Sequence, residues 1–264
     1  MSDLTDRTIT ALRTGHDELA TLVSGLSHDE LTQPSAAAEW NIAQVLSHLG
    51  SGAEIGLATL EAAVAGTGNR GSNVNESVWT RWNAMTAGEH AEGFLRADEA
   101  LVTRYESLDD TTRAQLRIDL GFLPEPVDVA TSAALRLSEF TLHAWDIQVV
   151  FDPAAVLAPA AVELLLDRLS MLIGFIGHPD VLDGRPMSVA VQTSEPARSF
   201  GLDLHDAVAL VDTPQQPAGV LDTPAEAWLR LAAGRLAPQH TPTALQLTSD
   251  VITLDDLRGV FPGY

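Results

Sequence analysis

The spacing of apolar side chains is the feature that most constrains the fold of this chain. Up to residue 151 they recur every three or four positions, the period of an amphipathic helix. The pattern predicts helices over about residues 9–23, 41–66, 76–108 and 129–151, the third interrupted near Thr86–Gly88. Helices of this kind bury their apolar stripes against one another, so we expect a four-helix bundle.

The second half of the chain has a different pattern. From about residue 181, "RPMSVAVQTS", "ARSFGLDLHDAVALVD" and "TALQLTSD" alternate as strands do. "TPAEAWLRLAAGR" predicts a helix with Thr223 as N-cap, and "DTPQQPAGVLDTP" is interpreted as a loop. The predicted organisation is therefore a helical bundle over 1–155 and a small α+β domain over 156–264. A helix over 158–177 could belong to either half.

Composition excludes several classes of partner and site. The chain has 36 acidic residues against 15 basic ones, all arginine, and a formal net charge of −21, which argues against binding nucleic acid or an anionic membrane. It has no long apolar segment and no secretory signal at its start, so we expect a cytoplasmic protein. Because there is no cysteine, any metal site must use His, Asp and Glu, and any thiol must come from a bound small molecule.

The stretch "SEFTLHAWD", residues 138–146, carries three possible ligand-bearing side chains on one helix. At about 100° per residue, Glu139, His143 and Asp146 lie on a polar stripe directly beside the apolar stripe that contains Phe140. Glu139 and His143 are four residues apart and can meet at one point. Taken alone, the pair fits an ordinary salt bridge on an exposed helix face at least as well as a metal site.

His48, in "WNIAQVLSHLG", offers a third ligand. It is either a histidine at the edge of the core that bonds a backbone carbonyl, or a side chain that points into the bundle toward Glu139 and His143. Two imidazoles and one carboxylate, with one position left for water or substrate, are typical of catalytic zinc.

Two of these stretches resemble a known family. "EWNIAQVLSHL" (39–49) and "RLSEFTLHAWDI" (136–147) resemble the DinB-like superfamily and, more closely, the mycothiol-dependent maleylpyruvate isomerase family. "NVNESVWTRW" (73–82) resembles the entry to that family's third helix. "AWLRLAAGR" (227–235) and "LRGVFPGY" (257–264) resemble its small, sterol-carrier-like C-terminal domain. The resemblance implies a DinB-like metal-binding four-helix bundle followed by a small α+β domain.

The resemblance also implies a metal and a cofactor. The family holds a divalent metal, usually zinc, with His, Glu and His, which correspond to His48, Glu139 and His143 here. Asp146 fits a role in orienting a ligand. The family uses mycothiol, so the implied partners are this thiol and a small electrophilic substrate.

A mechanism follows as a hypothesis. A metal-bound mycothiol thiolate attacks an electrophilic carbon; in an isomerase elimination then returns the thiol, whereas in a transferase the adduct is released. Arg235 is the candidate catalytic residue that holds a substrate carboxylate, or it is an ordinary arginine at a helix end. Arg81, Asn75 and Arg136 are candidate cofactor-binding residues. The alternatives are a non-catalytic metalloprotein that binds a small ligand, and a thiol-independent metal hydrolase. We expect a monomer or small homo-oligomer.

The other histidines and the tryptophans are interpreted as structural. The five tryptophans are expected to have packing roles, with Trp40 at the start of the second predicted helix and Trp145 against the site. The remaining histidines, which lack partners at ligand spacing and are expected in loops or on the surface, are His16, His28, His90, His178, His205 and His240.

Overall fold

The computed structural model describes residues 2–69, 71–182 and 184–263, and the chain divides into two compact units. These units are Met1–Asp152 and Pro153–Tyr264, so the division lies three residues before the one proposed from the sequence. The helix expected over 158–177 is α8 (Pro159–Ile176) and belongs to the second unit. The predicted fold class, a helical bundle followed by a small α+β unit, is confirmed.

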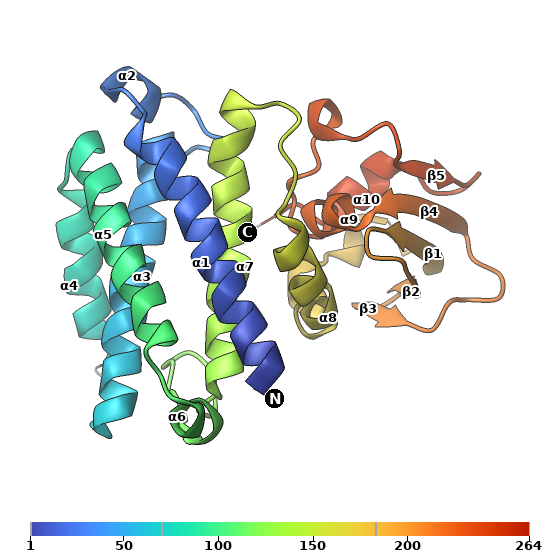
Figure 1. Cartoon of the computed structure of the whole chain (residues 1–264). Helices are drawn as coiled ribbons and strands as arrows, with labels where there is room; N and C mark the ends of the chain where they lie inside the picture. Colours follow the sequence, from blue (N-terminus) through green and yellow to red (C-terminus); the bar gives the residue numbers. More distant parts are fainter. Residues whose placement is uncertain (1, 70, 183, 264) are drawn as a thin grey trace. The chain divides into compact units, whose positions relative to one another are not determined.

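The first unit is a four-helix bundle with three accessory helices (Figure 1). Its helices are α1 (Ser2–Ser24), α2 (His28–Leu31), α3 (Ile42–Ala65), α4 (Ser72–Asn83), α5 (Ala87–Glu106), α6 (Asp110–Gln115) and α7 (Val129–Phe151). The bundle consists of α1, α3, α5 and α7, with α3 packed on α5 and α1 packed on α7. Helix α4 packs against α3 outside the bundle.

The helix ends follow from capping residues in the sequence. Asn41 forms a capping box with Gln44 at the start of α3, and Gly66 ends that helix in the left-handed conformation at φ 66°. The predicted break near residues 86–88 is confirmed, since α4 ends at Asn83 and Thr86 caps α5 through a hydrogen bond to the Glu89 backbone. The third predicted helix is therefore two helices, of which α5 joins the bundle.

A close approach of α3, α4 and α5 fixes the position of Trp82. This indole is 2% exposed, and it lies against Gly50 and Gly93. A Cβ at Gly50 would lie 2.2 Å from the Trp82 ring, and one at Gly93 would lie 2.8 Å from it. Only residues without a side chain allow the two bundle helices to meet the indole this closely.

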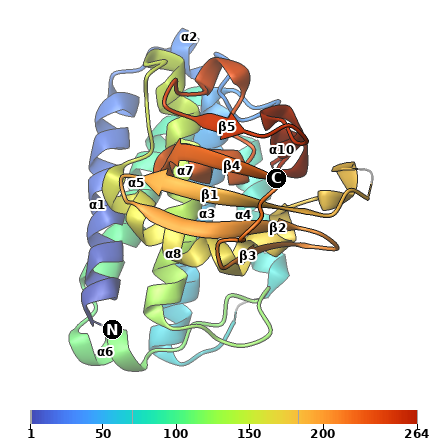
Figure 2. The same ribbon diagram turned by 90° about the vertical axis from the view of Figure 1, so that its right-hand side faces the viewer.

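The second unit is a five-stranded mixed sheet with helices (Figure 2). The strands are β1 (Met187–Ser194), β2 (Arg198–Leu204), β3 (Val208–Val211), β4 (Gly219–Pro224) and β5 (Gln246–Thr248), in the order β3-β2-β1-β4-β5. Strands β1 and β4 are parallel, and the other neighbours are antiparallel. The remaining elements are α8, α9 (Ala225–Ala232), α10 (Leu254–Val260) and the short 3₁₀ turns Pro179–Leu182 and Pro238–His240.

The loop interpretation of residues 212–224 is wrong at its end. Gly219–Pro224 is strand β4, paired with β1 on one side and β5 on the other. Its alternating burial, with Leu221 fully buried, is what places it inside the sheet. Thr223 consequently belongs to the strand, and the N-cap of α9 is Pro224, which offers no side-chain cap.

Aromatic packing forms the core of the second unit. Trp228 of α9 is fully buried, with its ring centroid 5.5 Å from that of Phe200 and 6.1 Å from that of Phe261. Burial of large rings of this kind dominates the stability of a small domain. No helix formed by the described residues is both long and apolar enough to cross a bilayer.

Candidate metal centre

Three candidate ligands from two helices of the first unit lie close together. His48 is on α3, and Glu139 and His143 are on α7. The Glu139 Oε2 atom lies 3.2 Å from His48 Nε2 and 3.9 Å from His143 Nε2. The three ligand atoms all lie within 4.8 Å of one another. The structure therefore brings together the three residues that the sequence pattern singled out.

Asp146 lies behind His143 and orients it. The fully buried carboxylate accepts a hydrogen bond from His143 Nδ1 at 2.9 Å. Its own backbone carbonyl accepts from the Ala36 amide at 2.9 Å, which ties this turn of α7 to the loop before α3. With the proton on Nδ1, the lone pair of His143 Nε2 faces Glu139, as in carboxylate–histidine–metal arrangements.

The donor set fits a divalent metal such as zinc. A tetrahedral zinc with bonds of about 2.0–2.1 Å places its ligand atoms about 3.3 Å apart. The separations of 3.2 and 3.9 Å from Glu139 Oε2 to the two imidazoles are close to this value. His48 and Glu139 are each about 40% exposed at the side chain, whereas His143 is 8% exposed, so the cluster is open on one side.

The electrostatic surroundings keep the Glu139 carboxyl ionised. Burial by itself raises the pKa of this group, but the hydrogen bond from His48 and the electrostatic interactions with His143, His48 and Arg136 outweigh it. The net result is a Glu139 pKa below its ordinary value. An ionised carboxylate is the form that can bind a cation.

Arg136 lies one turn before Glu139 on α7 and forms a buried ion pair with Asp98. Its Nη2 donates to Asp98 Oδ1 at 2.6 Å and to the Leu49 carbonyl at 3.0 Å, and the side chain is 10% exposed. Asp98 is fully buried and also accepts from His16 Nδ1 at 2.8 Å. This contradicts the expectation that His16 lies in a loop or at the surface. Cofactor binding by Arg136 remains a prediction, in a side chain already bonded to two oxygens.

His16 also belongs to a second group of possible ligands, with Asp17 and Glu99. Arg13 already binds both carboxylates of this group, with Nη1 at 2.6 Å from Glu99 and 3.5 Å from Asp17. It also bonds Glu106, and the hydrogen bonds to Glu106 and Glu99 raise the pKa of the Arg13 guanidinium. The group is therefore an ion-pair cluster around Arg13.

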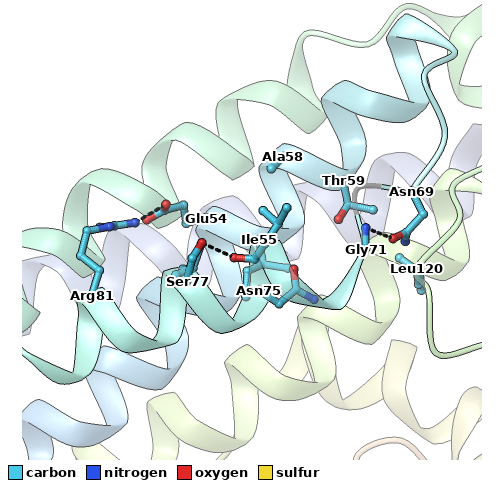
Figure 3. Close-up of a pocket in the computed structure, with 12 residues that line it drawn as sticks. Glu54, Ile55, Ala58, Thr59, Asn69, Gly71, Asn75, Ser77, Arg81 and Leu120 are labelled. Atoms are coloured by element: carbon cyan, nitrogen blue, oxygen red, sulfur yellow. Dashed lines mark hydrogen bonds and ion pairs between the residues drawn. The ribbon is translucent and has the colours of Figure 1, made fainter.

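Asn75 and Arg81 line a separate cavity along α3 and α4. The cavity has a volume of about 270 Å³ and also includes Glu54, which forms an ion pair with Arg81 (Figure 3). Glu54 additionally accepts from Trp82 Nε1 at 2.9 Å. Burial favours a higher pKa for Glu54, but these two partners lower it below the ordinary value. The described lining includes none of the three candidate metal ligands, so a role of Asn75 and Arg81 in cofactor binding stays a prediction.

Arg235 lies in the second unit and is 9% exposed. Its backbone amide donates to the Arg230 carbonyl at 2.7 Å, and its Nη1 donates to the Ala233 carbonyl at 3.0 Å. These contacts fix the chain just after α9, next to Gly234 at φ 71°. Its proposed catalytic role stays a prediction.

Two tryptophans near the candidate ligands are partly exposed. Trp40 is 36% exposed, and its ring centroid lies 5.2 Å from that of His48 and 5.9 Å from that of His143. Trp79 on α4 is 48% exposed. Trp40 directly precedes the start of α3, as expected, and both side chains line a cavity that includes His48.

Comparison with known proteins identifies the family of the chain. A family model described as the mycothiol maleylpyruvate isomerase N-terminal domain matches residues 12–148, which include all three candidate ligands. The chain belongs to this family. The match ends within α7, so it covers the bundle and leaves the second unit outside.

Solved structures extend the likeness of this family member to both units. Similar structures include the mycothiol-dependent maleylpyruvate isomerase and a histidine-to-alanine mutant of that enzyme. In each case the identity is 13%, the TM-score is 0.62, and the comparison covers 94% of this chain and 94% of the solved one. At this identity the likeness establishes the fold. No curated protein matches the chain.

Proposed function

We propose that the protein is a metal-dependent enzyme that uses mycothiol to isomerise a small electrophilic substrate or to transfer the thiol to it. The observation that carries the proposal is the convergence of His48, Glu139 and His143 in a member of this family. The fold that the chain shares with a solved mycothiol-dependent maleylpyruvate isomerase supports the proposal.

The three candidate ligands and Asp146 each contribute differently to binding a cation. Glu139 supplies a carboxylate that stays ionised, and His48 supplies an imidazole from the opposite helix. Asp146 holds the His143 proton on Nδ1, which leaves Nε2 as the donor atom. A divalent metal bound by these three groups favours the thiolate form of a small thiol near neutral pH.

Metal content tests the centre directly. The protein is purified without a metal-binding tag from cells given zinc, and bound metal is measured by elemental analysis in the wild type, His48→Ala and His143→Ala. His28→Ala, at an exposed position on α2, is the matched control. We expect about one metal ion per chain in the wild type and control and a loss in the other two variants. A wild type without metal would overturn the centre.

Turnover then decides the chemistry. Conversion of maleylpyruvate that requires mycothiol and returns it unchanged indicates an isomerase, whereas a thioether formed with a bimane electrophile indicates a transferase. Turnover without thiol would favour a metal hydrolase. Metal and thiol binding with no turnover of either substrate would favour a non-catalytic ligand-binding protein.

A further inference from the structure

The indole of Trp40 lies against both candidate histidine ligands. Its ring centroid is 5.2 Å from that of His48 and 5.9 Å from that of His143, with interplanar angles of 43° and 29°. The centroids of the two imidazoles are 4.7 Å apart, and these rings meet edge to face. The three rings therefore form one aromatic cluster, in which Trp40 contacts both candidate ligands without being one.

The two histidines differ in how their rings are held. His143 is 8% exposed at the side chain, and its Nδ1 donates to Asp146. His48 is 41% exposed at the side chain, and its Nε2 is the atom that faces Glu139. Within the described part of the chain, His48 Nδ1 has no hydrogen-bond partner. A metal-binding histidine usually has a partner on its second nitrogen that fixes the ring, so the orientation of His48 depends on the rings packed against it.

A short loop fixes the position of the indole. The carbonyl of Trp40 accepts from the amide and the hydroxyl of Ser35, at 2.9 and 2.8 Å. The Ala36 amide donates to the Asp146 carbonyl at 2.9 Å, which ties the loop to α7. Trp40 directly precedes Asn41, the N-cap of α3. The loop is thereby attached to both of the helices that carry the candidate ligands.

The backbone of this loop is strained at Glu39. Its φ of 65° is in the left-handed region, which a residue with a side chain seldom adopts. The Glu39 side chain is exposed. Strain of this kind persists where the surrounding contacts impose it, and it is concentrated at functional sites. Because the next residue is Trp40, the strained turn leads directly into the residue that contacts the candidate ligands.

We propose that Trp40 is a positioning residue of the candidate metal centre, which holds the His48 imidazole in place and stabilises the metal-bound form of both histidines. Coordination to a cation withdraws electron density from an imidazole and gives the ring partial positive charge. The face of an indole attracts positive charge at distances up to about 6 Å from its centroid, and both imidazoles lie within this range. The attraction is therefore stronger with metal than without it. The inference rests on the proposed function, since it requires that His48 and His143 bind a metal.

The zinc affinity of two Trp40 variants tests this role. Trp40→Leu keeps an apolar side chain but removes the aromatic face, whereas Trp40→Phe keeps a smaller aromatic face. Trp79→Ala is the matched control, because Trp79 is a second partly exposed indole in the cavity beside His48 and, among the described ring contacts, stacks on neither imidazole. Affinity is measured on the full chain by competition with a chromogenic zinc chelator, and circular dichroism verifies that each variant is folded.

We expect Trp40→Leu to raise the zinc dissociation constant by about tenfold, as the loss of a group that orients a ligand does. Trp40→Phe should stay within about threefold of the wild type, because it keeps most of the attraction to the imidazoles. Trp79→Ala should bind zinc as the wild type does. The cobalt(II)-loaded proteins provide a second readout, since the visible absorption of bound cobalt(II) depends on the groups that coordinate it. This spectrum should change in Trp40→Leu and be retained in Trp40→Phe.

The outcomes separate the role of Trp40 from the proposed function. Equal zinc affinities of Trp40→Leu and Trp40→Phe would overturn the proposal, whatever the turnover of the wild type, because the aromatic face would then not act on the ligands. Zinc binding that depends on the aromatic face in a protein without thiol-dependent turnover supports the role of Trp40 and contradicts only the proposed enzyme. A wild type that binds no zinc would overturn both.

Discussion

Arg136 Nη2 lies 2.6 Å from Asp98 Oδ1, and this ion pair joins α7 to α5 inside the bundle. Arg136 also donates to the carbonyl of Leu49, the residue that follows the candidate ligand His48 on α3, while Asp98 accepts from His16 on α1. Asp98 and Arg136 together thereby link all four bundle helices. They do so one turn away from Glu139, so they help to set the spacing of the two helices that carry the candidate ligands.

Asp98→Asn should lower the free energy of unfolding by about 3 kcal/mol, because it leaves the Arg136 charge buried without its counter-ion. Urea unfolding followed by circular dichroism measures the change. Glu92→Gln is the matched control, since the Arg96–Glu92 pair is more than 70% exposed at both side chains. The control should change stability by no more than about 0.5 kcal/mol. Equal effects of the two substitutions would contradict a structural role for the buried pair.

The same carboxyl should make stability depend on acid pH. Burial favours a higher pKa for Asp98, but Arg136 and the hydrogen bonds from His16 and Arg136 outweigh it and hold the pKa below its ordinary value. An aspartate of the unfolded chain has a pKa of about 3.9, so the stabilisation is complete above that pH and is lost as pH falls through the lower folded pKa. Between pH 6 and pH 3, unfolding in urea should show a larger loss of stability in the wild type than in Asp98→Asn. If the free energy of unfolding fell equally with pH in the two proteins, Asp98 would not be the group responsible.

Local sequence signals were sufficient for both ends of α3 and for the start of α5, whereas α1 begins at Ser2, seven residues before its predicted start. The start of α3 at Asn41, its end at Gly66 and the break at Thr86 are each set by one capping or left-handed residue and its immediate neighbours. Strand β4 was missed for the opposite reason. Gly219–Pro224 becomes a strand through pairing with β1, some thirty residues earlier, and with β5, which are contacts that a local pattern does not contain.

The site was predictable where its residues share a helix and less so where they do not. Glu139 and His143 are one turn apart, so their spacing alone indicated that they meet. His16 was misjudged because its partner, Asp98, is 82 residues away. A signal was nevertheless present, since His16 lies on the buried stripe of α1 between Leu12 and Leu19. A titratable residue in such a stripe needs a buried partner.

Gly50→Ala should destabilise the first unit by about 1–3 kcal/mol, because the new Cβ would lie 2.2 Å from the Trp82 ring and force α3 and α4 apart. Gly88→Ala is the matched control. A Cβ at Gly88 meets nothing within 4 Å, and the position is in the first turn of α5, so alanine there should be neutral or stabilising by up to about 1 kcal/mol. Thermal unfolding of both variants measures the difference. A Gly50→Ala protein as stable as the control would show that the Trp82 contact is not tight.

Asp146→Asn should weaken metal binding by about tenfold while leaving all three candidate ligands in place. The carboxylate that accepts from His143 Nδ1 at 2.9 Å holds the imidazole in the tautomer with Nε2 unprotonated, and an amide oxygen is a weaker acceptor for this hydrogen bond. Competition with a chromogenic zinc chelator measures the affinity. The matched control is Asp110→Asn, at an exposed position in the first turn of α6, which should bind zinc as the wild type does. Because Asp146 is fully buried, the variant's unfolding is followed in excess EDTA, which separates a loss of stability from a loss of affinity. An affinity within twofold of the wild type would show that Asp146 packs against the ligand helix without acting on His143.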